Sequence, residues 1–292
     1  MTSAIESSKR IKAFRCQLIA AIPRFPNDKA SLEELEGKSL TDLLMTYIGW
    51  RLRYVAARPR KVTGMSTLDG DPRATTLKEN IDTFLQAVED GHDLTRYLSL
   101  APHTRGYTPT AQSQSPGANT WADKDFVLNV MGLHHFHLDL AKEKAGHRGG
   151  PNEMVFASVT RATFEILGLF THAAFDYEDD DTMTPERVKL WSIYATRQAA
   201  GALPGQLTTG GYGGLGITLS SQPAAVTRTA QRHVKILREI EPKLDNLAYV
   251  HTLYGKNGVP EKPKLKWHYR HLDFGLLDED AGFFRILAQG PN

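Results

Sequence analysis

The chain has little cysteine and no long apolar run. Its 292 residues include a single cysteine, Cys16, which excludes an internal disulfide framework and a cysteine-based zinc site. No segment approaches the roughly 20 consecutive apolar residues that a membrane span needs. We therefore expect a cytoplasmic protein that has no membrane partner and is at home in a reducing compartment.

An excess of charge of one sign is also missing. The formal net charge is +2, from 35 lysines and arginines against 33 acidic residues. This balance excludes a strongly basic wrapper of nucleic acid, although it leaves room for a local basic patch. The glycine-rich run at residues 210–216 lacks the lysine and the Ser/Thr of a P-loop, and its spacing does not match the dinucleotide fingerprint. No cofactor is predicted.

Helical patterns dominate the first hundred residues and return after the middle of the chain. Apolar residues at helical spacing predict a helix at residues 40–55, with Ser39 as its N-cap, and a second helix that ends near residue 89. A later helix is expected to begin near Pro185. Another should follow Ser221 and continue to about residue 241.

The pattern between these helical regions is that of strands. Three apolar runs at residues 133–140, 154–159 and 164–170 have short connections, which is typical of an antiparallel meander. A final apolar run at residues 283–287 predicts an edge strand. The fold class is therefore expected to be α+β, with a helical N-terminal region, a central antiparallel β-meander and helices following it.

Residues 102–120 are rich in Thr, Ser, Gln, Pro and Gly and form the best linker candidate in the chain. Two interpretations stay open, namely a boundary between domains and a long loop that orders over a site. The predicted organisation is a helical N-terminal region at residues 1–101, this linker or loop, and an α+β domain at residues 121–292 that carries the meander.

Three histidines within four residues mark the first strand of the meander. They are His134, His135 and His137, and histidine is both an acid–base group near neutral pH and the commonest metal ligand. Because side chains alternate across a strand, His135 and His137 share one face while His134 points the other way with Phe136.

Three functional interpretations of this run stay open. The histidines can form a catalytic pair, or they can be structural residues of a non-enzymatic binding module. The third interpretation is a metal-dependent hydrolase. In it His135 and His137, together with His172 or Asp139, furnish nitrogen or oxygen ligands to the metal.

A short motif follows the third predicted strand. It reads Thr171-His172-Ala173-Ala174-Phe175-Asp176 and resembles the Thr-His-Ala-x-Tyr-Asp segment that ends the sheet of RelE/HigB-like ribonuclease toxins. The resemblance spans residues 133–176, because the preceding order of strands and loops is also similar. Two positions differ: Phe175 stands where the family has a tyrosine, and His137 stands where the family often has an arginine.

The resemblance implies an endoribonuclease of toxin–antitoxin or phage-defence type that cleaves RNA without a metal, with an antitoxin protein as a further partner. In this chemistry the 2′-hydroxyl attacks the adjacent phosphate. The reaction requires a base, an acid that protonates the leaving oxygen and a cation that stabilises the charge of the phosphorane. Under this hypothesis His137 and His172 are the acid–base pair and Asp176 orients His172. The residues expected to bind the phosphate are His147, Arg148 and Arg161.

Overall fold

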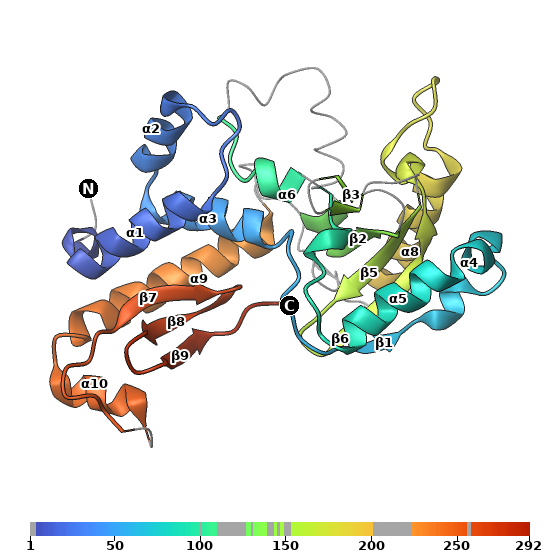
Figure 1. Ribbon diagram of the computed structural model, residues 1–292. Coiled ribbons are helices and arrows are strands. Elements are labelled where there is room, and N and C mark those ends of the chain that lie inside the picture. The colour runs from blue at the N-terminus through green and yellow to red at the C-terminus, as the bar shows by residue number, and fades with distance from the viewer. Residues whose placement is uncertain are drawn as a thin grey trace. The chain divides into compact units, whose positions relative to one another are not determined.

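The computed structural model describes residues 4–99, 101–109, 127–129, 131–138, 143–144, 147–148, 153–200, 223–255 and 258–292. The chain forms two compact units, each assembled from stretches that are distant in sequence. Unit 1 comprises Met1–Leu52, Arg105–Pro109 and Val226–Pro291, whereas unit 2 comprises Arg53–Thr104, Thr110–Ala225 and Asn292. Figure 1 shows the helices and strands of both units.

Unit 2 is built on a four-stranded sheet in the order β1-β6-β5-β2. The antiparallel strands β2 (Leu133–His137), β5 (Met154–Val159) and β6 (Thr163–Phe170) confirm the predicted meander. The fourth strand, β1 (Lys61–Thr63), pairs with β6 in parallel. It was not predicted, because three residues are too few to show a period of two.

Helical elements of unit 2 pack against both faces of this sheet. On one face, Phe84 of α5 (Lys78–Glu89) contacts Phe136 of β2 and Phe164 of β6. The opposite face packs against η5 (His172–Phe175) and α8 (Pro185–Ala200). The remaining elements of this unit are η2 (Met65–Leu68), α4 (Pro72–Thr76), η3 (Thr95–Tyr97), α6 (Ala101–Thr104), β3 (Glu143–Lys144) and β4 (His147–Arg148).

Unit 1 combines helices with a second antiparallel sheet. Strands β7 (Lys266–Arg270), β8 (Asp273–Asp278) and β9 (Phe283–Ala288) are ordered β7-β8-β9. Helices α1 (Lys9–Ala21), α3 (Leu40–Arg51) and α9 (Ala224–Ile240) share a core with it. Tyr269 and Phe274 of the sheet form the centre of this core, where both contact Phe14 of α1 and His233 of α9. The other elements are η1 (Ala4–Ser7), α2 (Lys29–Gly37), η6 (Glu241–Lys243) and α10 (Leu247–Tyr254).

The α+β class is confirmed, and several predicted boundaries hold. The Ser39 hydroxyl accepts a hydrogen bond from the Asp42 N–H at 3.1 Å, so Ser39 caps α3 as predicted, although that helix ends at Arg51. The predicted second helix is interrupted at Leu77, which separates α4 from α5. The edge strand expected near residue 283 is β9. No helix in the described part of the chain is long and apolar enough to cross a membrane.

Some predictions lie outside the described residues. These are the glycine-rich run at 210–216, the helix cap at Ser221 and most of the linker candidate at 102–120. The division of the chain at 102–120 stays a prediction, whereas each compact unit draws on separate stretches of sequence.

Candidate functional site

The strand register of unit 2 brings two of the predicted histidines together. His137, the last residue of β2, pairs with Met154 of β5, and Met154 pairs in turn with Phe170, the last residue of β6. His172 follows β6 directly as the first residue of η5. The ring centroids of His137 and His172 are consequently 5.5 Å apart, with 35° between the ring planes.

His135 completes a histidine cluster, which we define as His135, His137 and His172. The His135 ring centroid lies 5.9 Å from that of His137 and 5.2 Å from that of Phe175. His137 is 8% exposed, whereas His135 and His172 are half-buried. The predicted alternation along β2 is confirmed, because His134 lies on the opposite face and stacks near Phe136.

Phe175 forms an apolar wall of the histidine cluster. Its ring is buried against His135, and its centroid lies 6.4 Å from that of His172. This is the position at which the resembled toxins carry a tyrosine. A phenyl ring has no proton to donate, whereas a tyrosine hydroxyl has one.

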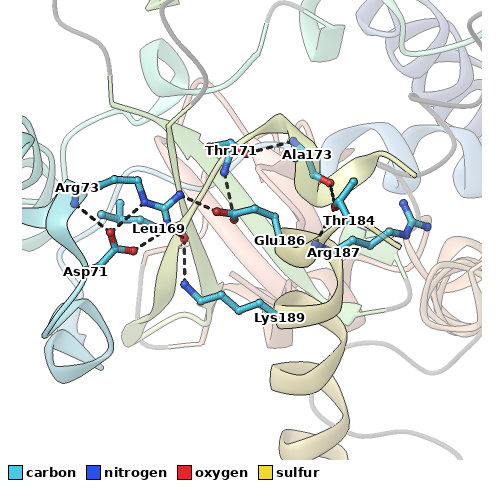
Figure 2. Close-up of polar contacts among 9 residues, drawn as sticks. All are labelled: Asp71, Arg73, Leu169, Thr171, Ala173, Thr184, Glu186, Arg187 and Lys189. Atoms are coloured by element: carbon cyan, nitrogen blue, oxygen red, sulfur yellow. Dashed lines mark hydrogen bonds and ion pairs between the residues drawn. The ribbon is translucent and has the colours of Figure 1, made fainter. Parts of the chain in front are cut away.

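The turn that carries His172 is fixed to α8 (Figure 2). The Thr184 hydroxyl donates to the Ala173 carbonyl at 2.5 Å, as Figure 2 shows. Arg187 donates from Nη1 to the Phe175 carbonyl at 2.8 Å. Within the turn, the Thr171 hydroxyl accepts from the Ala173 N–H at 3.3 Å. Hydrogen bonds from Thr184, which directly precedes α8, and from Arg187 in its first turn therefore hold η5, and with it His172, in place.

A charged network lies beside this turn, at the carboxyl end of β6 (Figure 2). Glu186 accepts the Thr171 N–H at 3.4 Å through Oε2 and pairs with Arg73 Nη1 at 2.7 Å through Oε1. Arg73 also pairs with Asp71 at 2.7 Å and donates to the Leu169 carbonyl at 3.0 Å. A second cation, Lys189, donates to the same carbonyl at 3.3 Å.

The members of this network reinforce one another's charge. The hydrogen bond from Arg73 lowers the pKa of the Asp71 carboxyl, and the same hydrogen bond raises the pKa of the Arg73 guanidinium. Both groups are therefore charged at neutral pH. Charged side chains therefore lie beside the turn that carries His172.

Other predicted site residues lie elsewhere in unit 2. Arg161 sits in the turn between β5 and β6, at the far end of β6 from His172. The eight residues of that strand separate the two positions by roughly 25 Å. Asp176 directly follows η5, where its side chain is exposed and its N–H donates to the Ala173 carbonyl at 3.1 Å. His147 and Arg148 form β4, whose backbone lies against η3.

The metal-binding alternative draws on His135 and His137 together with His172 or Asp139, and Asp139 lies outside the described residues. Within the described ranges, no group of three or more His, Cys, Asp or Glu side chains is placed to hold a metal ion. His135, His137 and His172 all belong to the described part of the chain.

The charged partners of η5 could not be found from the sequence. Arg73 and Glu186 are more than a hundred positions apart, and no spacing rule joins them. Asp71 has a local signal, because an acidic residue before Pro72 is a typical start of a helix, and it does accept the Arg73 N–H at 3.0 Å. That signal predicts a helix cap and gives no hint of an ion pair with α8.

Comparison with known proteins gives no relative: no family model matches the chain, and no match was found among curated proteins or solved structures. Function is therefore inferred from the geometry of the histidine cluster.

Proposed function

We propose that this protein is a metal-independent endoribonuclease in which His137 and His172 are the general acid–base pair. The observation that carries the proposal is the 5.5 Å between their ring centroids. Attack by a 2′-hydroxyl and departure of the 5′-oxygen take place at one phosphorus atom. The base and the acid must each come within about 3 Å of its oxygen, so the two groups have to be neighbours themselves.

The reaction balances with the two imidazoles alone as proton carriers. One neutral histidine removes the proton of the 2′-hydroxyl as that oxygen bonds to phosphorus. The other, protonated histidine donates its proton to the leaving 5′-oxygen as the P–O bond breaks. The products are a 2′,3′-cyclic phosphate and a new 5′-hydroxyl, and the proton has moved from one histidine to the other.

Phe175 sharpens the assignment. In the resembled toxins a tyrosine occupies this position, and here the phenyl ring leaves both proton transfers to histidine. Arg148 is the predicted cation that stabilises the phosphorane. Asp176 is the residue predicted to orient His172. A cytoplasmic toxin or phage-defence role, with an antitoxin partner, is part of the proposal through the resemblance.

Cleavage of total RNA by the purified protein tests the proposal. We expect cleavage that persists in EDTA and falls by about 10²–10⁴-fold in His172→Ala, the range typical of one acid–base group. His92→Ala is the matched control, because His92 is exposed and lies in the same unit. Full activity of His172→Ala, or no cleavage by the unaltered protein, would overturn the proposal.

A further inference from the structure

Helix α9 carries a basic face in unit 1. Its buried side chains, which include Val226, Ala230, Val234 and Leu237, pack into the core of that unit. The exposed side chains on the other side are mostly cationic. They are Arg228, Gln231, Arg232, Lys235, Arg238 and Glu239. Four positive charges and one negative charge therefore face solvent over a single helix surface.

The spacing of these cations makes a continuous stripe. Successive residues of an α-helix turn by about 100° and rise by about 1.5 Å. Arg228, Arg232 and Lys235 therefore lie within about 60° of one another around the helix. Arg238 lies about 60° to one side, and Glu239 follows at the C-terminal end of the same sector. The stripe is about 15 Å long. Like charges four residues apart destabilise a helix, which makes Arg228 and Arg232 an unfavourable pair unless an anion lies over them.

The arginines of the stripe are not neutralised by the protein. Lys235 pairs with Glu239 at 3.8 Å. For Arg228, Arg232 and Arg238, by contrast, the described residues provide no carboxylate within ion-pair distance. Three guanidinium groups are thus available to an external ligand, and guanidinium pairs well with phosphate oxygens.

We propose that this exposed face of α9 binds the phosphate backbone of single-stranded RNA. The inference rests on the proposed function for its choice of polyanion, since RNA is there the substrate. A row of cations matches a chain of regularly spaced phosphates. Insertion of α9 into a membrane does not fit this arrangement, because the apolar side chains of the helix are buried in the core of unit 1. The surface that α9 presents to a partner is mainly charged.

The test compares two triple variants of the full chain, both carrying His172→Ala so that RNA stays intact. The first is R228Q/R232Q/R238Q. The second is K29Q/K78Q/K262Q, which removes the same net charge from exposed positions outside α9. Binding of a short single-stranded RNA is measured between about 50 and 200 mM salt, where each phosphate contact contributes about 0.7 to the salt slope.

We expect the arginine variant to lose affinity at least tenfold at low salt and to lower the slope of log Kd against log salt by about 2. The lysine control should keep the slope of its parent. Equal slopes for the two variants, or no RNA binding by the parent, would overturn the inference. Arginine-dependent binding to phosphatidylserine vesicles but not to RNA would also overturn it.

A dinucleoside phosphodiester separates this inference from the ribonuclease proposal. In the His172→Ala background the arginines are tested by binding alone, whereas cleavage of this minimal substrate by protein that retains His172 reports on the histidine cluster. With His172 present and α9 unaltered, cleavage of this substrate tests the histidine cluster by itself. RNA binding that depends on the arginines, without any cleavage, supports the proposed RNA-binding face of α9 and contradicts the ribonuclease proposal. Cleavage together with RNA binding that does not depend on the arginines supports the ribonuclease proposal and contradicts the one for α9.

Discussion

His172 and His233 lie in different surroundings. In unit 2, His172 is half-buried beside His137 at the end of a sheet. In unit 1, His233 of α9 is only 2% exposed, and its Nδ1 lies 2.7 Å from the Tyr269 hydroxyl oxygen. Burial lowers the pKa of His233 to about 4, and the nearby Arg232 acts in the same direction. Burial therefore holds His233 in its neutral form.

The neutral state of His233 predicts a pH-dependent stability. Between about pH 4 and pH 6.5 the unfolded chain binds a proton at His233 that the folded chain does not bind. Stability therefore rises with pH across this window, and acidification through it costs up to about 3 kcal/mol from this residue. Urea unfolding at several pH values measures the effect.

His233→Gln is the comparison for this measurement, because it retains a hydrogen-bonding side chain but does not titrate. The difference in unfolding free energy between the two proteins should shrink as the pH falls from 7 to 4. A difference that stays constant with pH would show that burial does not keep His233 neutral.

At the scale of secondary-structure elements, the position of the short turn η5 determines where His172 lies relative to His137. The 3-10 turn η5 carries His172, and the first turn of α8 holds it through Thr184 and Arg187. Thr184 has two tasks, because its hydroxyl donates to the Ala173 carbonyl and also accepts the Arg187 N–H at 3.2 Å. The same oxygen thus caps α8 and fastens the turn.

Removing the Thr184 hydroxyl should displace His172 from its position beside His137. We expect Thr184→Val to lower RNA cleavage about tenfold, because misplacement by even about 1 Å is costly for a catalytic group. Thermal unfolding should show a loss of about 1–2 kcal/mol from the missing cap. Thr184→Ser, which retains the hydroxyl, should restore cleavage.

Thr196→Val is a control in the same helix, where the Thr196 hydroxyl donates to the Ser192 carbonyl at 2.9 Å on an exposed surface. The role assigned to Thr184 is contradicted if its valine variant cleaves RNA as fast as the Thr196 variant does.

For the molecule as a whole, local sequence patterns predicted individual helices and strands better than the way in which these elements pack together. The alternation of apolar residues along β2 correctly put His135 and His137 on one face, because a strand has a period of two wherever it lies. In the meander, β5 pairs with both β2 and β6, so β2 and β6 terminate at the same end of the sheet. His137 and His172 are therefore close to each other. These steps need only short-range information.

Long-range pairings were not predictable. The sheet of β7 and β8 packs against α1, although these segments lie near opposite ends of the chain, and no local pattern reports such a contact. The ion pair of Arg73 with Glu186 is hidden for the same reason. Arg161 illustrates the converse, because it is close to His172 in sequence yet lies at the other end of β6.

The central claim is that His137 and His172 exchange protons with one phosphodiester. The pH dependence of kcat/KM for RNA cleavage tests it most directly, because a pair that needs one neutral and one charged imidazole gives a bell-shaped profile. We expect that bell for the unaltered protein and the loss of one limb in His137→Ala or His172→Ala. A bell of the same shape in both variants would contradict the claim, since the titrating groups would then be other residues.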